Sequence, residues 1–243
     1  MLEAFEKYVN NYDMENRDIK LKYNHSYRVM ELSKKYATKL GFSKHDIELA
    51  TLIGLLHDFG RFEQLRVYNS YNDLKTVDHA DYSVEQLFDK GEIKDYTDNE
   101  EDYEIIKFAI KYHNKHSIPN VDNERMLMHA KLIRDTDKLD IIYLMGTLHE
   151  LNLKATDDSL TKEVLECIKE HKTIDKRYSK TKNDRIAVQF AFAFDIYNDV
   201  CLEELKENYK AFYKQIDGED IFKDVYEEVI KYIDERIGKY VRN

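Results

Sequence analysis

The feature that most constrains the fold is an apolar run from Leu49 to Leu56 that ends in His57 and Asp58. Burial of such a run is favourable, at roughly 25 cal/mol per Å² of apolar surface. Two ionisable side chains at its end are costly to bury unless they are paired or bind a metal. Imidazole and carboxylate groups are ordinary ligands of Zn, Mn and Fe. A bound divalent cation would resolve the conflict, so the other histidines and acids of the chain are candidates for further ligands.

Composition favours a helical protein. The chain has 243 residues, of which 42% are hydrophobic and 35% charged, so it can fill a core and cover it. One proline and seven glycines are few helix breakers for this length. No segment rich in proline, glycine or serine divides the chain. We therefore expect one all-α domain over residues 1–243, with a metal-site core at about 17–155 and a C-terminal helical cap at about 156–243.

Charge and cysteine content argue against several classes of protein. The net charge of −10 opposes broad contact with nucleic acid or with an anionic membrane, since both require a basic surface. The two cysteines indicate a reducing compartment without a disulfide framework. The first residues are acidic, unlike a signal peptide, and no apolar run approaches the ~20 residues that span a bilayer. We expect a cytoplasmic protein.

Apolar residues recur at helical spacing through most of the chain, and no segment has the alternating pattern of a strand. We expect helices at residues 13–40, 47–57, around 84–88, 103–112, 123–138, 141–151, 160–172, 186–198, 202–213 and 221–240. Gly41 and Gly60 are expected to end the first two of these helices. The segment from Phe62 to Thr76 is aromatic and less periodic, so we expect a loop that overhangs the site.

A further histidine and a further aspartate stand on predicted helices. His25 lies within the first long helix, and Asp137 lies at the end of the helix predicted at 123–138. Helical bundles build internal metal sites from side chains that converge from different helices. Asp135 and Asp140 are alternatives to Asp137, although either could cap a helix or pair with a neighbouring cation.

The ordered set of His25, the His57-Asp58 pair and Asp137 resembles the HD superfamily of metal-dependent phosphohydrolases. That family is marked by one histidine, then a His-Asp pair and then a later aspartate, all on helices. The local contexts also match, namely NHS, LLHDFG and IRDTDKLD. The resemblance covers roughly residues 23–144, and it implies a single HD-type helical bundle to which C-terminal helices are added.

Two more histidines extend the resemblance. His79 and His113 lie between the His-Asp pair and the later aspartate. HD proteins with a two-metal centre, such as the HD-GYP phosphodiesterases and bacterial diadenosine tetraphosphate hydrolases, carry two extra histidines in this interval. The alternatives are a helix-cap role for His79, and His116 in place of His113. The implied ligands are His25, His57, Asp58 and Asp137 for one ion, and Asp58, as a bridge, with His79 and His113 for a second.

Two cations are candidates for contact with a phosphate. The pair Gly60-Arg61 resembles the Gly-Lys that follows the His-Asp pair in HD-GYP proteins, where the lysine meets the substrate phosphate. Arg61 could make this contact with its fork of N–H donors, and Lys138 could neutralise further charge. The alternatives are ion pairs, of Arg61 with Glu63 or another nearby acid, and of Lys138 with Asp135. The chain has no GYP motif, so the resemblance does not extend to a cyclic dinucleotide substrate.

The resemblance implies a metal-dependent phosphomonoesterase or phosphodiesterase. One or two divalent ions (Mn, Fe, Ni, Zn or Mg) would lower the pKa of a bound water toward ~7 and polarise the phosphoryl oxygen. Asp58, Arg61 and Lys138 would be the catalytic side chains. The expected substrate is a nucleotide or another small phosphate ester, without nucleic-acid or membrane partners, and the oligomeric state is left open. The alternative is a non-catalytic ligand-sensing or scaffold protein that keeps a metal in a closed coordination sphere.

Overall fold

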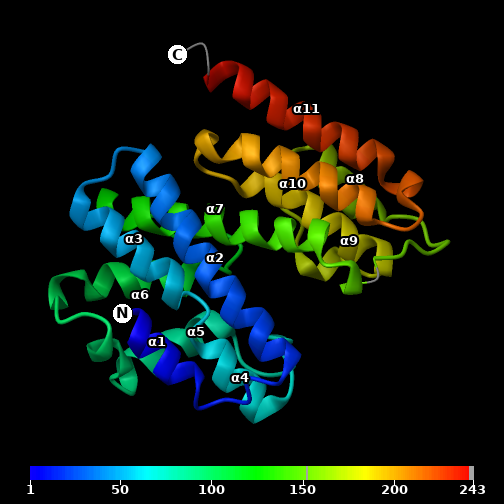
Figure 1. The fold of residues 1–243 in the computed structure, drawn as a ribbon. Helices are drawn as coiled ribbons and strands as arrows, with labels where there is room; N and C mark the ends of the chain where they lie inside the picture. Colours follow the sequence, from blue (N-terminus) through cyan, green and yellow to red (C-terminus); the bar gives the residue numbers. More distant parts are fainter. Residues whose placement is uncertain (152, 241–243) are drawn as a thin grey trace. The chain divides into compact units, whose positions relative to one another are not determined.

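The computed structural model describes residues 1–151 and 153–240, and these form helices and no β-strand (Figure 1). The all-α fold predicted from the sequence is confirmed. The α-helices are α1 (Leu2–Val9), α2 (Arg17–Lys39), α3 (Lys44–Leu56), α4 (Gly60–Tyr68), α5 (His79–Val84), α6 (Tyr103–Tyr112), α7 (Glu124–Thr147), α8 (Lys162–Lys169), α9 (Lys182–Phe190), α10 (Leu202–Gln215) and α11 (Lys223–Tyr240). A π-helix, η1 (Glu85–Asp89), continues α5. The 3-10 helices are η2 (Glu92–Asp95), η3 (Glu100–Asp102), η4 (His149–Leu151), η5 (Lys176–Tyr178), η6 (Ala191–Asp195), η7 (Asp199–Cys201) and η8 (Glu219–Phe222).

The chain divides into two compact units, one from Met1 to Thr136 and one from Asp137 onward. The boundary falls inside α7, which is continuous from Glu124 to Thr147. The single domain, with its core at about 17–155 and its cap at about 156–243, therefore stays a prediction.

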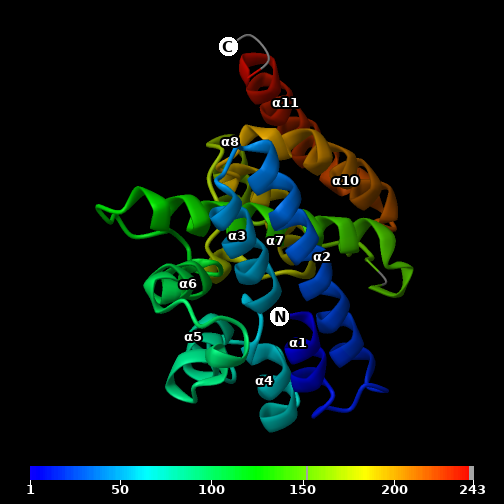
Figure 2. The same cartoon turned by 60° about the vertical axis from the view of Figure 1, so that its left-hand side comes forward.

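In the first unit, α2 and α3 lie side by side (Figures 1 and 2). Each helix begins at a capping side chain, because Asn16 accepts a hydrogen bond from the backbone of Asp18 and Ser43 accepts one from Asp46. Gly54 permits the close packing of the two helices. A Cβ atom at this position would lie 2.7 Å from Oγ of Ser33 and 2.9 Å from the backbone of α2.

The segment after the His-Asp pair corrects two sequence-based expectations. Residues 60–68 form α4, whereas we expected a loop from Phe62 to Thr76, and the irregular segment is confined to residues 69–78. Gly60 begins this helix rather than only ending the previous one. A Cβ atom on Gly60 would lie 2.6 Å from the backbone nitrogen of Ser83, so the glycine allows α4 to start against α5. Its own N–H donates to the hydroxyl of Ser83 over 2.8 Å.

The end of α3 is fully enclosed by the core of the first unit. Leu55, Leu56 and Phe59, which flank the His-Asp pair, have no exposed surface. The ring of Tyr8 in α1 stacks on that of Phe59 with 3.8 Å between the centroids. The apolar surroundings therefore hold His57 and Asp58 away from bulk water, as expected from the apolar run that precedes them.

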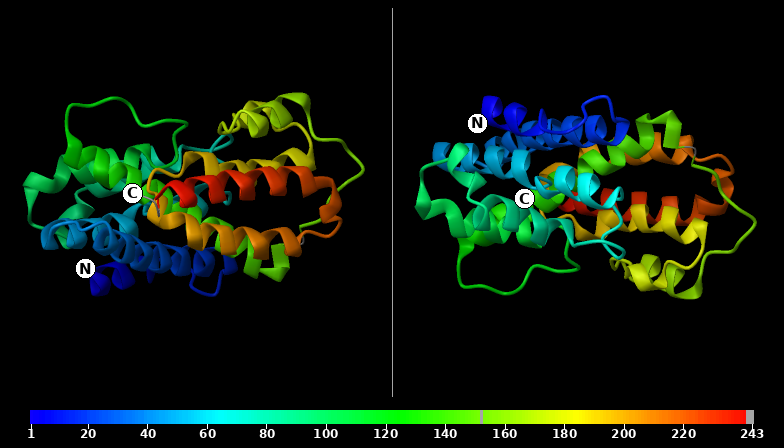
Figure 3. Two further views of the ribbon diagram at one scale, coloured as in Figure 1. Left: turned by 90° about the horizontal axis from the view of Figure 1, so that it is seen from above. Right: turned by 90° about the horizontal axis from the view of Figure 1, so that it is seen from below.

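The second unit is built from the second part of α7 and from α8 to α11, of which α10 and α11 lie side by side (Figure 3). Its core is aromatic, and the ring of Phe190 lies 4.6 Å from that of Phe212. Two predicted helices are shorter than expected. The helix expected at residues 160–172 is α8, which covers only Lys162–Lys169. In place of the helix expected at residues 186–198, the structure has α9 and the 3-10 helix η6. A capping box formed by Thr181 and Asp184 starts α9 four residues earlier than the apolar period indicated.

Candidate metal centre

Four histidines and one aspartate of the first unit are buried together. They are His25 within α2, His57 and Asp58 in the turn between α3 and α4, His79 at the first position of α5, and His113 directly after α6. They come from four separate segments of the chain, as predicted for a site inside a helical bundle. Five of the six predicted metal ligands are thus neighbours within one compact unit.

The carboxylate of Asp58 stands between two pairs of imidazoles. Its Oδ2 atom lies 3.6 Å from Nε2 of His25 and 3.7 Å from Nε2 of His57. Its Oδ1 atom lies 3.4 Å from Nε2 of His79 and 3.7 Å from Nε2 of His113. The two oxygens of one side chain therefore face two different pairs of nitrogen atoms.

Within each pair, the Nε2 atoms of the two rings point toward one another. They are 3.1 Å apart between His25 and His57, and 3.0 Å apart between His79 and His113. The rings of each pair are steeply inclined, at 69° and 71°. Two nitrogens that both carry lone pairs repel at this distance. A proton or a cation is therefore needed between the two Nε2 atoms of each pair.

Backbone carbonyls fix the orientation of two of these rings. Nδ1 of His57 lies 2.8 Å from the carbonyl oxygen of Gly54, and Nδ1 of His113 lies 2.6 Å from that of Ile110. A carbonyl oxygen only accepts hydrogen bonds, so both Nδ1 atoms carry the proton. The Nε2 lone pairs are then directed at the centre. This is the usual arrangement of metal-binding histidines, whose second nitrogen donates to a carbonyl or a carboxylate.

The carboxylate of Asp73 fixes the orientation of the His79 ring. Nδ1 of His79 donates to Oδ2 of Asp73 over 2.5 Å. Burial lowers the pKa of His79 to about 4, so its ring is neutral at physiological pH. Burial opposes ionisation of Asp73 as well, but the hydrogen bond from His79 and the nearby Arg61 hold the pKa of Asp73 well below its ordinary value. The pair is therefore a neutral imidazole oriented by an ionised carboxylate.

The positively charged ammonium of a lysine lies next to the carboxylate of Asp58. Nζ of Lys22, in α2, lies 2.6 Å from Oδ2 of Asp58. Burial raises the pKa of Asp58, but the ammonium of Lys22 and the ring of His57 outweigh it and keep the pKa well below its ordinary range. The carboxylate is therefore ionised in a buried position, where a charge requires a partner.

A divalent cation fits these groups. Among the residues that the structure describes, no hydrogen-bond donor reaches the buried Oδ1 atom of Asp58. Imidazole nitrogens bind metals at about 2.0–2.1 Å, and two nitrogens in neighbouring coordination positions then lie roughly 3 Å apart, as the Nε2 atoms do here. Ligand atoms within 4.8 Å of one another form two groups in this unit, which are His25, His57 and Asp58, and Asp58, His79 and His113. The residues fit one ion or two.

A comparison with protein families adds an independent observation. The model of the family described as HD domain matches residues 23–197, more than half of the chain. The chain belongs to the HD domain family. HD domains indicate the superfamily of metal-dependent phosphohydrolases, whose members bind divalent metals. No curated protein and no solved structure was found to match this chain.

In this HD domain, Arg61 is held rigidly at the edge of the centre. Its Nη1 atom donates to Oε1 of Gln64, to the carbonyl of Tyr71 and to Oδ1 of Asp73, each over 2.8 Å. Its Nε atom lies 3.7 Å from Oδ1 of Asp58, and within the described residues it has no hydrogen-bond partner. The acid that pairs with Arg61 is Asp73 rather than Glu63. Contact of Arg61 with a phosphate stays a prediction.

The last HD motif lies at the boundary between the units. Asp137 follows Thr136 in α7 and is the first residue of the second unit. Lys138 is nearly buried, and its ammonium lies 2.8 Å from Oδ2 of Asp195 in η6. Lys138 is therefore a buried residue and not a surface one. The roles of Asp137 as a ligand and of Lys138 as a phosphate contact stay predictions.

Two residues at the centre escaped sequence reasoning. Lys22 precedes His25 by three positions, so both lie on one face of α2, and this spacing could have identified the lysine. Asp73 lies in the irregular segment 69–78, where no periodicity indicates which side chains point inward. His116, the alternative to His113, is exposed.

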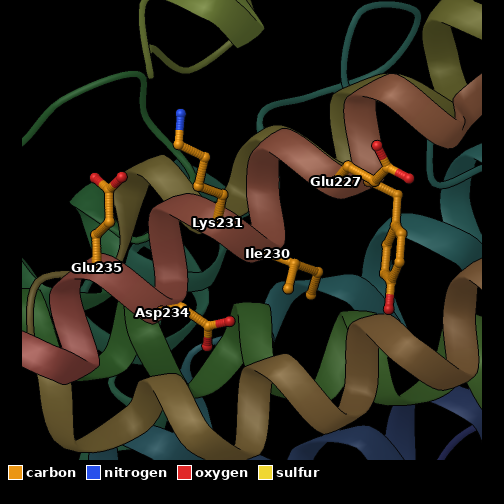
Figure 4. A pocket seen from close by; sticks show the side chains of 6 residues that line it. Glu227, Ile230, Lys231, Asp234 and Glu235 are labelled. Carbon is orange, nitrogen blue, oxygen red and sulfur yellow. The ribbon is translucent and has the colours of Figure 1, made fainter.

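The HD motif residues do not line the surface hollow found on α11 (Figure 4). That hollow is lined by Tyr226, Glu227, Ile230, Lys231, Asp234 and Glu235. It carries three carboxylates and one ammonium, so its charge does not favour a phosphate. Across the described part of the chain, no helix is long and apolar enough to cross a membrane.

Proposed function

We propose that the chain is a metal-dependent phosphomonoesterase or phosphodiesterase that acts on a nucleotide or another small phosphate ester. The observation that carries the proposal is the position of Asp58, whose two oxygens each face a different pair of imidazoles. A carboxylate in this position can bridge two cations. Two-metal hydrolases use ions roughly 3.5–4 Å apart to hold both the attacking and the leaving oxygen.

The proposed ligands are His25, His57, Asp58 and Asp137 for one ion, and Asp58, His79 and His113 for the other. The assignment of Asp137 rests on the resemblance of the IRDTDKLD segment to the last HD motif. Divalent ions bound to such a set lower the pKa of a water toward ~7 and polarise the phosphoryl group.

Arg61 is the proposed contact for the phosphate. Three acceptors hold its Nη1 atom, so the guanidinium is oriented before a substrate binds. A planar fork of N–H donors matches the oxygens of a phosphate better than a flexible ammonium does. Orientation in advance reduces the entropy lost on binding.

Lys22 is a second proposed cation for the substrate. Its ammonium bonds to Oδ2 of Asp58, the oxygen that faces His25 and His57. A divalent ion that takes this oxygen would displace the ammonium and leave it beside the centre, where it could bond to a phosphate. Lys138 is retained as a third candidate, whose ammonium would have to leave Asp195.

The test is hydrolysis of a panel of nucleoside mono-, di- and triphosphates, cyclic nucleotides and a chromogenic phosphate ester, with added Mn, Fe, Ni or Mg. Metal content is measured on the same samples. We expect turnover of at least one compound by the wild-type protein and loss of turnover in His57→Ala. His116→Ala changes an exposed histidine outside the centre and should keep the activity. Metal-loaded protein that hydrolyses no compound would contradict the proposal and favour a sensing or scaffold role.

A further inference from the structure

Asp73 connects the histidine side of the centre to the arginine. Its Oδ2 atom accepts a hydrogen bond from Nδ1 of His79 over 2.5 Å. Its Oδ1 atom accepts from Nη1 of Arg61 over 2.8 Å and from Nε2 of Gln64 over 3.1 Å. One side chain therefore contacts both a candidate metal ligand and the candidate phosphate contact.

A buried glutamine holds the segment that carries Asp73. Gln64, in α4, is fully buried, and its Nε2 atom also donates to Oγ1 of Thr76 and to the carbonyl of Val77, over 2.8 and 3.0 Å. Arg61 adds a hydrogen bond to the carbonyl of Tyr71. These bonds span the segment 69–78 on both sides of Asp73. These hydrogen bonds therefore fix the position of the Asp73 carboxylate.

The contact determines which nitrogen of His79 carries the proton. An ionised carboxylate accepts hydrogen bonds and cannot donate one, so Nδ1 of His79 must be the donor. The other polar group near this nitrogen is Nδ2 of Asn114, at 3.3 Å, and it donates to both carboxylate oxygens of Asp78. With Nδ1 protonated, Nε2 keeps its lone pair and faces His113 and Asp58.

We propose that Asp73 is a positioning residue with two roles. It keeps His79 in its metal-binding tautomer, and it holds the guanidinium of Arg61 in a fixed position relative to the His79 ring. The part of this inference that concerns Arg61 and phosphate rests on the proposed function. The part that concerns metal binding by His79 does not. Groups that orient a metal-binding histidine in this way typically contribute 10- to 100-fold in affinity or activity. The expected effect of removing the carboxylate is therefore about 10- to 100-fold weaker binding of one ion.

Asp73→Asn tests the inference because it preserves size and removes the second acceptor oxygen. If the amide group faces His79, it donates to Nδ1, and the proton moves to Nε2. We expect ¹⁵N NMR of the metal-free protein to show His79 protonated at Nδ1 in the wild type and at Nε2, at least in part, in the variant. We also expect one Mn²⁺ site to lose affinity in a titration with Mn²⁺ alone.

The matched control is Asp81→Asn, which changes an exposed carboxylate two residues after His79 that pairs with Lys115. It should alter neither the tautomer nor the affinity for Mn²⁺. The inference is overturned if Asp73→Asn leaves both unchanged. It is also overturned if His79 in the wild type is protonated at Nε2, a result that does not depend on the folding of any variant. A wild-type protein that binds Mn²⁺ but hydrolyses no phosphate would refute the proposed function and leave this test intact.

Discussion

In the first unit, two clusters combine histidine with aspartate, and they differ in the cations that contact the aspartate. In one cluster, Asp46 lies 2.6 Å from Nε of Arg125 and 3.1 Å from Nε2 of His129. In the other, four imidazoles surround Asp58, the ammonium of Lys22 lies 2.6 Å from Oδ2, and Nε of Arg61 lies 3.7 Å from Oδ1. In the first cluster a guanidinium contacts the carboxylate, whereas in the second four imidazoles face the carboxylate together with an ammonium.

The Asp46 cluster shows that a His-Asp contact does not by itself indicate a metal site. The pKa of Asp46 is lowered against the effect of burial, through hydrogen bonds from Ser43 and Arg125. Asp46 also belongs to the first turn of α3, where an acid is favoured by the helix dipole. Its cluster is therefore explained by stability alone. The Asp58 centre, where each carboxylate oxygen faces a pair of imidazoles, is not.

The largest expected difference between the clusters is in catalysis. His57→Ala should lower turnover by more than about 100-fold, since it removes a proposed metal ligand and not a group that only orients a ligand. His129→Gln should leave turnover near the wild-type value and reduce the free energy of unfolding by about 1–3 kcal/mol, because Asp46 loses a buried partner. Steady-state kinetics and denaturant unfolding of both variants measure these effects. Equal losses of activity would contradict the distinction.

Replacement of the cation in each cluster should also give different results. Lys22→Met leaves Asp58 buried without its closest cation, so the metal-free protein should lose about 3–5 kcal/mol of stability. Mn²⁺ should restore the Tm and should bind more tightly than to the wild type, because its competitor is gone. Arg125→Met should lower the Tm in a way that Mn²⁺ does not repair. Thermal unfolding with and without Mn²⁺ decides the outcome, and a Lys22→Met protein insensitive to Mn²⁺ would count against an exchangeable cation.

Within the Asp58 centre, binding of substrate should be separable from binding of metal. Arg61→Gln should raise the KM for the phosphate ester by about 10- to 100-fold, the range expected for a lost charged hydrogen bond. The affinity for Mn²⁺ should change less than in Asp73→Asn, since Arg61→Gln leaves the hydrogen bond between Asp73 and His79 in place. The measurement is KM together with a Mn²⁺ titration. An unchanged KM would remove Arg61 from the substrate site.

The smallest expected difference concerns pH. Burial places the pKa of His79 at about 4, below the ordinary value of 6.5, and burial also lowers the pKa of His129. Protonation then favours the unfolded chain, so stability should fall as pH drops from about 6.5 to about 4, by at most about 1.4 kcal/mol per pH unit for each histidine. Mn²⁺ should remove the contribution of His79 and leave that of His129. Unfolding at several pH values, with and without Mn²⁺, measures this, and identical profiles would contradict it.

The sequence was informative where a residue's role depends on its near neighbours. The apolar run before His57 and Asp58 indicated a buried pair, and the helical patterns indicated an all-α fold. The loop expected after Phe62 was wrong because α4 buries both apolar and polar side chains, so Gln64 disrupts the periodicity that would reveal a helix. The role of Asp73 depends on hydrogen bonds from Gln64 and Arg61, which no local pattern encodes.

The central claim is that Asp58 holds divalent cations together with the four histidines. Elemental analysis after saturation with Mn²⁺ and removal of unbound ion tests it most directly, with Asp58→Asn as the isosteric comparison. The account predicts two ions per chain in the wild type and fewer than one in the variant. A wild-type protein that retains no metal, or an Asp58→Asn protein that retains as much as the wild type, would contradict it.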